Sequence, residues 1–437
     1  MSGHIGIRRE DKNEWERRVP LIPTDVGVLK RRHEIAVSLQ PFPTRAFRDA
    51  EYIGVGATID ESLEGCNVVL GIKEMPIDFF KPDLTYVFFA HVIKGQPYNM
   101  PMLRKILDTG SNLLDYEKIT DEHERRLVFF GSEAGQAGMI DTLWALGLRL
   151  AGEGIENPFT GIRKATEYSR LTAAEVAIED VGRQIEEHGV PEDIHPVVFG
   201  FAGYGNVSNG AQGVLSYMPV IEVTPAELLD SPPGLFDSRD HIYKVEFKEE
   251  DMVEPVDPDQ TFELQDYYDH PEKYRGVFAK YVPHLTVLMN CIFWTPAYPR
   301  LVTKSSIQEL YRDGEAKLKM IGDISVDVEG AVEITLKTTD PGNPVFVYDV
   351  DSGKAIDGVK GNGPVILAVD NLPAELPRES STRFSETLAP FIPNLAKADF
   401  SRVFDALDLD APLKRALICY HGSLTPDYEY LDEYLDK

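Results

Sequence analysis

Three short apolar runs near the amino terminus each end at residues that can move a proton. Lys73 and Glu74 follow the first run, His91 follows the second, and Asp115 and Glu117 follow the third. Short, nearly continuous apolar runs are typical of buried parallel strands, and ligands bind outside the carboxyl ends of such strands. The sequence therefore predicts an acid/base site in which a lysine, a histidine and carboxylates meet at one edge of one sheet.

A structural explanation of the same residues is also open. Lys73 and His91 could be loop residues that follow strands and pair with nearby carboxylates for solubility. However, a structural role does not require titratable groups at three successive strand ends, whereas proton transfer during carbonyl chemistry does. We therefore favour a catalytic interpretation.

The elements that would position these groups alternate along the first part of the chain, which predicts an α/β domain. Strands are expected at residues 5–9, 34–40, 67–72, 85–90 and 111–114, with helices at 23–32 and 99–108. A helical stretch at 133–150 would bridge to a second domain. Helices at 380–391 and 401–407 and the tail 425–436 suggest that the chain returns to complete the first domain.

A glycine turn marks the second domain. Its expected elements are strands at 197–200, 220–224, 284–293, 319–324 and 365–369, with a helix at about 211–217. Strand, glycine turn, helix and strand are the context that makes a Gly-x-Gly-x-x-Gly pattern a dinucleotide-binding candidate. Gly203 would allow the tight turn and Gly205 the close approach of a pyrophosphate to the helix amino terminus, with Ser208 in place of the third glycine. A glycine turn without a ligand is the structural alternative.

The preference between NAD and NADP is open from these residues. Thr224 falls roughly where NAD enzymes carry the acid that binds the ribose, with Glu222 and Glu227 nearby. A missing acid removes the repulsion of a 2′-phosphate, but no arginine stands beside Thr224 to attract one.

Length and composition describe a folded protein of two domains. The chain has 437 residues, of which 43% are hydrophobic and 10% aromatic, and no window reaches the ~18 unbroken apolar residues of a membrane helix. Its start already reads as a strand, so we expect no leader peptide and a cytoplasmic location. Cys66, Cys291 and Cys419 are expected to be buried thiols, and the histidine and cysteine spacings predict no metal site.

The formal charge of -28 argues against partners that need concentrated positive charge, namely nucleic acid and anionic membranes. It favours solubility and salt tolerance. An anionic substrate would need a local positive pocket, which Arg8, Arg9, Arg17 and Arg18 could provide. The sequence also lacks the nucleophile elbow of hydrolases and the phosphate loop of nucleotide triphosphatases.

Long motifs connect the chain to a known family over nearly its whole length. They lie at residues 6–10, 15–21, 71–74, 91–94, 99–100, 114–117, 134–141, 203–212, 264–271, 298–302, 321–325, 370–373 and 424–430. Through these motifs the chain resembles the lysine-2-oxoglutarate reductases, also called lysine-forming saccharopine dehydrogenases, of the alanine dehydrogenase superfamily. In bifunctional relatives a second, glutamate-forming dehydrogenase follows this region, so we expect a stand-alone first module.

The resemblance implies a fold and a cofactor. The fold is α/β, with two Rossmann-like domains whose parallel sheets flank a cleft. Residues 1–140 and 378–437 would form the substrate and catalytic domain, and residues 141–377 the dinucleotide-binding domain. The cofactor would be NAD(P), with NADP slightly favoured.

The resemblance also implies roles for single residues. Lys73 and His91 match the acid/base pair, and Arg18 matches an arginine that holds a substrate carboxylate. Glu74 and Glu117 match acidic positions that would bind substrate or modulate the pKa values of the pair. The cofactor-binding positions are Gly203, Gly205, Asn206, Val207, Ser208, Thr224 and Asp323, the last near the nicotinamide.

The implied reaction condenses L-lysine with 2-oxoglutarate and reduces the imine with NAD(P)H to saccharopine, or runs in reverse. The partners would be these small molecules, and a homo-oligomer stays open. Two alternatives remain: an alanine-dehydrogenase-like or opine-type enzyme with another amine or keto acid, and a nucleotide-binding module without catalysis.

Overall fold

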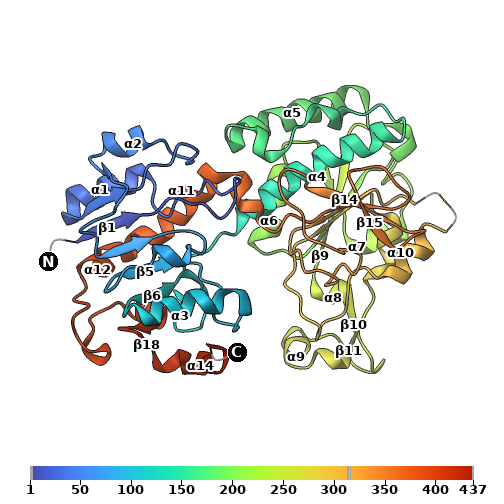
Figure 1. The fold of residues 1–437 in the computed structure, drawn as a ribbon. Coiled ribbons are helices and arrows are strands. Elements are labelled where there is room, and N and C mark those ends of the chain that lie inside the picture. Colours follow the sequence, from blue (N-terminus) through green and yellow to red (C-terminus); the bar gives the residue numbers. More distant parts are fainter. Residues whose placement is uncertain (1–2, 313, 315, 436–437) are drawn as a thin grey trace. The chain divides into compact units, whose positions relative to one another are not determined.

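The computed structural model describes residues 3–312, 314 and 316–435, which form two compact units (Figure 1). The first unit comprises Met1–Phe130 and Pro377–Lys437, and the second is Gly131–Leu376. Each unit is built on one eight-stranded sheet. The domain boundary expected at residue 140 falls inside helix α4 (Ser132–Gly152), which belongs to the second unit from its first residue.

The sheet of the first unit has the strand order β18-β17-β6-β5-β4-β1-β2-β3. Strands β1 to β6 run parallel, whereas β17 and β18 are antiparallel additions from the carboxyl-terminal segment. The strands are β1 (His4–Ile7), β2 (Ala36–Leu39), β3 (Thr58–Ile59), β4 (Val68–Leu70), β5 (Thr85–Phe88), β6 (Asn112–Asp115), β17 (Leu417–Tyr420) and β18 (Ser423–Leu424). Every residue of β4, β5 and β6 is buried, including the polar ends of β6, as expected for central parallel strands.

The helices of the first unit follow from local sequence signals. Helix α1 (Pro23–His33) has proline in its first turn and four basic residues in its last, both favourable for a helix. Helix α3 (Met100–Asp108) buries Met100, Leu103 and Ile106, whose spacing places them on one face. The remaining helices are α2 (Asp49–Gly54), α11 (Pro377–Leu388), α12 (Ile392–Lys397), α13 (Ala411–Arg415) and α14 (Asp432–Leu435).

The sheet of the second unit has the order β15-β14-β16-β13-β12-β7-β9-β8. Its strands are β7 (Val198–Ala202), β8 (Val220–Glu222), β9 (Ile242–Phe247), β12 (Val287–Asn290), β13 (Met320–Asp323), β14 (Val345–Asp349), β15 (Lys354–Asp357) and β16 (Val365–Leu367). Six strands are parallel, and β14 and β15 form an antiparallel edge. The α/β fold with two mainly parallel sheets is therefore confirmed.

Further elements surround this second sheet. A two-stranded ribbon consists of β10 (Val253–Pro255) and β11 (Tyr274–Gly276). Besides α4, the helices are α5 (Leu171–His188), α6 (Asn206–Leu215), α7 (Pro225–Asp230), α8 (Glu249–Met252), α9 (Leu264–Asp269) and α10 (Lys304–Leu310).

Two expectations about local structure need correction. The helix expected from residue 211 begins at Asn206, directly after the glycine turn. The helix expected at 401–407 is wrong, because only a short 3₁₀ turn forms there, at Phe404–Ala406. In the tail, a 3₁₀ helix at Pro426–Leu431 precedes α14, and Asp436 lies outside the described residues.

Two helices of the second unit pack through glycines. A Cβ added to Gly210 of α6 would overlap the carbonyl oxygen of Ser132, and one added to Gly135 of α4 would overlap that of Val207. Such close approach of two backbones is open only to residues without a side chain. The glycine pair therefore fixes α6, and with it the preceding turn, against α4.

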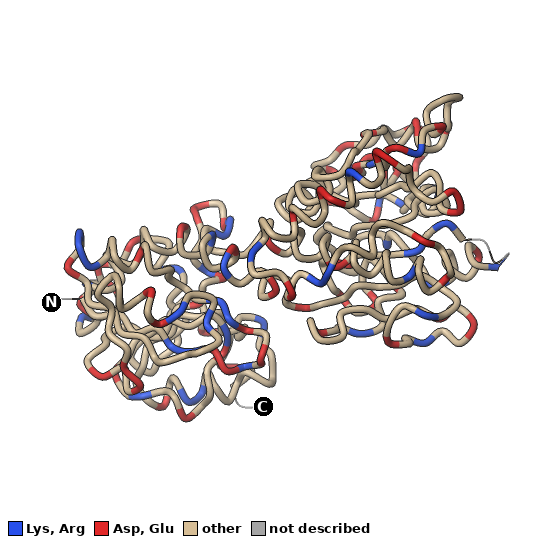
Figure 2. Tube along the Cα trace, turned by 90° about the horizontal axis from the view of Figure 1, so that it is seen from above, with Lys and Arg blue, Asp and Glu red and all other residues tan. Residues whose placement is uncertain are grey.

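Acidic and basic residues are interspersed along the chain in both units (Figure 2). Among the described residues, no helix combines the length and the apolar character that crossing a membrane requires. Cys66 and Cys419 are buried thiols as expected, whereas Cys291 is only half-buried.

Candidate active site

The three strands that precede the predicted acid/base residues are neighbours. Strand β5 lies between β4 and β6, and all three run parallel, with Leu70 beside Val87 and Phe88 beside Asp115. The loops that carry Lys73 and His91 therefore leave the same edge of the same sheet. The structure thus brings together the residues that the sequence placed at successive strand ends.

Glu74 links the two loops. His91 Nδ1 donates a hydrogen bond to Glu74 Oε1 at 2.7 Å, and Lys12 Nζ donates to Oε2 at 2.6 Å. Burial opposes ionisation of Glu74, but these hydrogen bonds outweigh it and hold its pKa well below the usual range. Glu74 is therefore an anion that orients the imidazole of His91.

Lys73 is half-buried beside this carboxylate. Burial, and next the positive charge of Arg18, lower the pKa of its ammonium group, while Glu16 and Glu74 raise it less. Within the described part of the chain, its Nζ makes no hydrogen bond or ion pair. A lysine in this environment gives up its proton more readily than a surface lysine does.

The backbone of His91 is held in an uncommon conformation. Its φ angle is 49°, in the left-handed region that non-glycine residues seldom occupy. The Asn99 side-chain amide donates to the carbonyl oxygens of Ala90 (2.9 Å) and His91 (3.2 Å). Asp115 accepts the backbone N–H of Ala90 at 3.1 Å. These contacts on both sides of the peptide sustain the strained geometry.

Glu10 holds the backbone of Lys73 in place, as Asn99 and Asp115 hold the backbone at His91. Its two carboxyl oxygens accept the backbone N–H groups of Ile72 (2.7 Å) and Lys73 (3.0 Å). Burial, and next the charge of Glu16, raise the pKa of Glu10 to about 7. Burial likewise raises the pKa of Asp115 to about 7. Glu10 was not predicted as a site residue, although it follows β1 as Lys73 follows the adjacent β4.

Arg18 is buried and oriented by a carboxylate. Its Nε and Nη2 donate to the two oxygens of Glu16 at 2.7 and 2.6 Å, and its guanidinium lies over the ring of Phe130 at 4.1 Å. The structure thus places Arg18 within the electrostatic reach of Lys73 and holds it rigidly.

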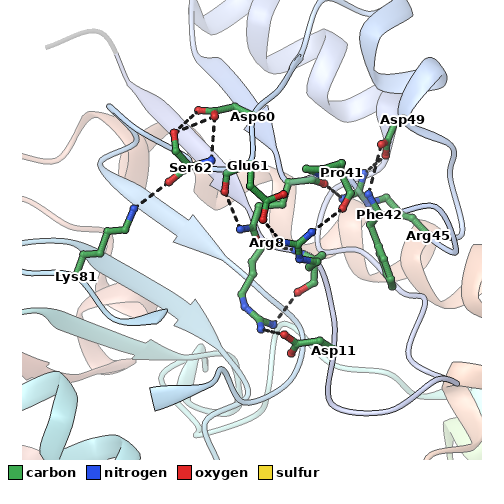
Figure 3. Close-up of polar contacts among 12 residues, drawn as sticks. Arg8, Asp11, Pro41, Phe42, Arg45, Asp49, Asp60, Glu61, Ser62 and Lys81 are labelled. Atoms are coloured by element: carbon green, nitrogen blue, oxygen red, sulfur yellow. Dashed lines mark hydrogen bonds and ion pairs between the residues drawn. The ribbon is translucent and has the colours of Figure 1, made fainter. Parts of the chain in front are cut away.

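Arg8 and Arg9, two of the other amino-terminal arginines, are also paired with carboxylates. Arg8 pairs with Asp11 (Figure 3). It also donates to the Arg9 carbonyl oxygen at 2.7 Å. Arg9 pairs with Glu61. With Arg18, three of the four arginines expected to attract an anion are therefore paired with carboxylates of their own unit.

Glu117 is not joined to the pair by a hydrogen bond. Its Oε1 accepts from Arg126 at 2.7 Å, and its backbone N–H donates to Asp115 at 2.9 Å. Its charge contributes to the raised pKa of Asp115. The structure therefore connects Glu117 to the carboxyl group beneath His91 rather than to Lys73.

A cavity of about 430 Å³ borders Glu74 in the first unit. Its wall includes the charged side chains of Asp11 and Lys12, together with Tyr98 and Asn99. Both signs of charge are thus present beside the acid/base residues.

In the second unit the glycine turn has the geometry of a phosphate cradle. Gly203 has a φ of 95°, and a Cβ there would lie 3.0 Å from Ile292, so the turn requires glycine. A Cβ at Gly205 would meet no atom within 4 Å. Gly205 caps α6, whose first-turn N–H groups receive no side-chain cap. Open space beside uncapped N–H groups fits the pyrophosphate of a dinucleotide.

The residues after Gly205 have distinct positions. Asn206 and Val207 open α6, while Ser208 is fully buried and accepts a hydrogen bond from Gln212 at 3.0 Å. The close packing usually assigned to the third glycine of this pattern is provided two residues later, by Gly210 against α4. The departure at Ser208 is therefore compatible with the fold.

Thr224 is not beside the glycine turn. Strand β9 lies between β7 and β8, so the strand before Thr224 is two positions from β7. The Thr224 hydroxyl accepts the backbone N–H of Glu227 at 3.2 Å, while the Glu227 carboxylate accepts from the backbone N–H and the hydroxyl of Thr224. This exposed capping box accounts for Thr224 as the start of α7.

Asp323 ends β13 and is fully buried. It accepts hydrogen bonds from Asn290 at 2.8 Å and from Thr335 at 2.6 Å. Burial raises its pKa to about 6, although both hydrogen bonds act against the shift. Asp323 therefore ties the carboxyl ends of β12 and β13 together.

A second cavity of about 420 Å³ adjoins the glycine turn. It is lined by Gly203, Tyr204, Gly205, Glu249, Met252, Val253, Tyr267, Tyr268, Cys291, Ile292, Phe293, Tyr298, Pro299, Arg300 and Leu301. Its aromatic and aliphatic walls with few polar groups are typical of a small-molecule site.

Two family models match the chain. The model of the alanine dehydrogenase/PNT N-terminal domain matches residues 6–137, and that of the alanine dehydrogenase/PNT C-terminal domain matches residues 272–427. Together they cover more than half of the chain.

Individual proteins are also similar. An alpha-aminoadipic semialdehyde synthase of Arabidopsis thaliana is 38% identical over 98% of this chain but only 41% of its own length. A saccharopine dehydrogenase [NAD(+), L-lysine-forming] of Neurospora crassa is 27% identical over 88% of this chain and 89% of its own. The solved structure of an L-alanine dehydrogenase matches 99% of both chains with a TM-score of 0.62 at 17% identity, which supports the fold alone. The chain spans less than half of the length of the Arabidopsis relative.

Proposed function

Because the chain belongs to the alanine dehydrogenase/PNT family, we propose that it is an NAD(P)-dependent oxidoreductase that forms saccharopine. It would condense L-lysine with 2-oxoglutarate and reduce the resulting imine, or catalyse the reverse reaction. The names of the Arabidopsis and Neurospora relatives support a role in lysine metabolism. The observation that carries the proposal is the cluster of Lys73, Glu74 and His91 on neighbouring strand ends.

The chemistry requires proton transfer at each step. The ε-amine of the substrate must be neutral when its nitrogen bonds to the keto carbon, and the carbonyl oxygen must leave as water. Lys73, whose pKa is lowered by burial, can accept the amine proton, and His91, oriented by Glu74, can exchange protons with the departing oxygen. A bound nicotinamide would supply the hydride that reduces the imine carbon. Glu10 and Asp115 would keep both loops in place.

The binding groups also suit these substrates. Arg18, held rigidly by Glu16, would pair with a carboxylate of the keto acid. The cavity beside Glu74 presents both signs of charge, which suits an amino acid. On the second unit, Gly203, Gly205, Asn206, Val207 and Ser208 would hold the pyrophosphate. Glu117 and Asp323 would act indirectly, through Asp115 and Asn290, and Thr224 would have no direct part.

The cofactor, oligomeric state and compartment are further parts of the proposal. Family resemblance slightly favours NADP, whereas the Neurospora relative is named for NAD(+). A cytoplasmic location stays a prediction, and the oligomeric state stays open.

The decisive assay follows the absorbance of NADH and NADPH when lysine and 2-oxoglutarate are added separately and together, with the product mass measured. We expect oxidation only when both substrates are present, and a product with the mass of saccharopine. Oxidation with a different amine or keto acid would replace the substrate assignment by the opine-type alternative.

The double variant Lys73→Met with His91→Gln tests the catalytic cluster. We expect it to lose at least ~100-fold in turnover while still binding the nicotinamide nucleotide, because the nucleotide residues belong to the other unit. Nucleotide binding by fluorescence serves as the folding control. A folded double variant with normal turnover would contradict the assignment and favour the structural explanation of these residues.

A further inference from the structure

The strand order of the second unit shows which strand ends beside the glycine turn. Strand β9 pairs directly with β7, with Ala202 beside Phe247, and the backbone N–H of Gly203 donates to the Phe247 carbonyl oxygen at 3.0 Å. The residues just after Phe247 therefore leave the sheet next to Gly203. In dinucleotide-binding folds, the strand beside the glycine-turn strand ends at the group that meets the ribose.

Thr224 does not occupy that place. Glu222 at the end of β8 pairs with Lys244, three residues before β9 ends. Strand β8 thus stops short of the edge and lies roughly 10 Å from β7, since neighbouring strands are ~4.8 Å apart. A residue that binds the ribose is therefore expected just after the end of β9.

Glu249 stands there and faces the cavity. It follows Phe247 by two residues, is half-buried, and lines the same cavity as Gly203 and Gly205. Its Oε1 accepts a hydrogen bond from the Tyr268 hydroxyl at 2.7 Å. Burial and the charge of Glu249 both raise the pKa of Tyr204 in the turn itself. A carboxylate oriented by a tyrosine can accept hydrogen bonds from sugar hydroxyls.

Two cations of this region, Arg300 and Lys244, already have partners of their own. Arg300 is the one basic residue in the cavity wall, and its Nε and Nη2 donate to the carbonyl oxygens of Gly330 (3.0 Å) and Glu329 (2.9 Å). Lys244 pairs with Glu222 and Gln212. A 2′-phosphate placed at Glu249 would therefore be repelled by its carboxylate. Arg300, in the same cavity wall, already donates hydrogen bonds to two carbonyl oxygens.

We propose that Glu249 binds the hydroxyls of the adenosine ribose and rejects a 2′-phosphate, so that the chain selects NAD(H) over NADP(H). This inference rests on the proposed nucleotide site and runs against the slight preference for NADP that the family resemblance implies.

The test is direct binding of NADH and NADPH in the absence of other substrates, by calorimetry, to the full chain and to Glu249→Ser. We expect the unmodified protein to bind NADH at least ~10-fold more tightly than NADPH. Glu249→Ser should weaken NADH and strengthen NADPH, so that the ratio of the two dissociation constants falls by about 10-fold or more.

Two matched variants separate the local charge from other effects. Glu250→Gln removes one negative charge from the next, exposed position and should leave the ratio unchanged. Tyr268→Phe keeps the carboxylate but removes its hydrogen bond, and should weaken NADH without strengthening NADPH. If Glu249→Ser fails to fold, Glu249→Gln, which keeps the shape of the side chain, gives the same comparison.

The outcomes distinguish this inference from the proposed function. Equal or tighter binding of NADPH to the unmodified protein, or a ratio that Glu249→Ser and Glu249→Gln leave unchanged, overturns the role of Glu249 alone. Failure of both nucleotides to bind overturns the nucleotide site and this inference with it. Selective NADH binding without turnover of lysine and 2-oxoglutarate supports Glu249 and counts against the proposed substrates.

Discussion

Two buried carboxyl groups, on Glu10 and Asp115, hold the loops that carry Lys73 and His91. Each accepts a backbone N–H from the loop of a neighbouring strand, and each has a pKa raised to about 7 by burial. The acid/base side chains are therefore positioned by groups that themselves change charge near neutral pH.

Glu10→Gln tests the energetic side of this arrangement. Because the folded state raises the pKa of Glu10 from 4.5 to about 7, neutral Glu10 stabilises the fold fully below its unfolded pKa, and this contribution is lost as the pH rises through about 7. The difference in unfolding free energy, unmodified protein minus variant, should fall by about 3 kcal/mol between pH 4.5 and pH 7.5. Denaturant titrations at several pH values measure it.

A surface carboxylate offers the control for this prediction. Glu61 pairs with Arg9 on the exterior, and Glu61→Gln should leave the pH dependence close to that of the unmodified protein. A free-energy difference for Glu10→Gln that is constant with pH would show that Glu10 keeps an ordinary pKa in the fold.

At the scale of single residues, the sequence predicted which titratable groups lie together but not the groups that hold their loops in place. Lys73, His91 and Glu74 could be found because titratable residues followed apolar runs. The hydrogen-bond partners of Glu10 could not be predicted, because they depend on β1 lying beside β4. Which strands are adjacent is a tertiary property. For the same reason the sequence pointed to Thr224, which follows the next strand along the chain, and gave no signal for Glu249, which follows the neighbouring strand in space.

At the scale of elements, the contact between α4 and α6 gives a sharp pair of substitutions. Gly210→Ala would force a Cβ into the Ser132 carbonyl oxygen and should cost ~2 kcal/mol or more, even after the gain in helix propensity. Gly213→Ala lies in the same helix with no atom within 4 Å of the added Cβ, and should stabilise by up to ~1 kcal/mol. Thermal unfolding of both variants measures the contrast.

The affinity for the nicotinamide nucleotide should also be lower in Gly210→Ala than in Gly213→Ala, because α6 begins at the glycine turn. A Gly210→Ala variant as stable as Gly213→Ala would mean that α4 and α6 are not held together at the distance seen here.

The failed helix prediction at 401–407 has a non-local cause. Phe400, Phe404 and Leu407 have helical spacing, but the Tyr420 hydroxyl donates to the carbonyl oxygens of Phe400 and Arg402. These contacts use the groups that a helix would need. By contrast, the buried strands β4 to β6 and helices α1 and α3 were predictable, because burial and periodicity agreed with local propensity.

At the scale of the whole molecule, the charge of -28 predicts a dependence on salt. Acidic residues are distributed over both units (Figure 2), and their mutual repulsion is screened as the Debye length falls from ~30 Å at 0.01 M to ~3 Å at 1 M salt. The unfolding temperature should therefore rise with KCl over this range.

An uncharged osmolyte separates screening from general stabilisation. NaCl should match KCl at equal ionic strength, whereas sucrose should not reproduce the steep rise at low concentration. An unfolding temperature that is flat or falls with salt would show that paired charges, such as Arg9 with Glu61, dominate over net repulsion.

The chain leaves the first unit after Phe130 and returns at Pro377, so the second unit is an insertion within the first. Strand β6 pairs with β17 through Leu114 and Leu417, about 300 residues apart. At a synthesis rate of ~5–20 residues per second, this pairing must wait for roughly 15–60 s after β6 has left the ribosome. During that time β6 is an open sheet edge able to pair with other nascent chains. Production of this protein in a cell should therefore depend on chaperones that act during translation.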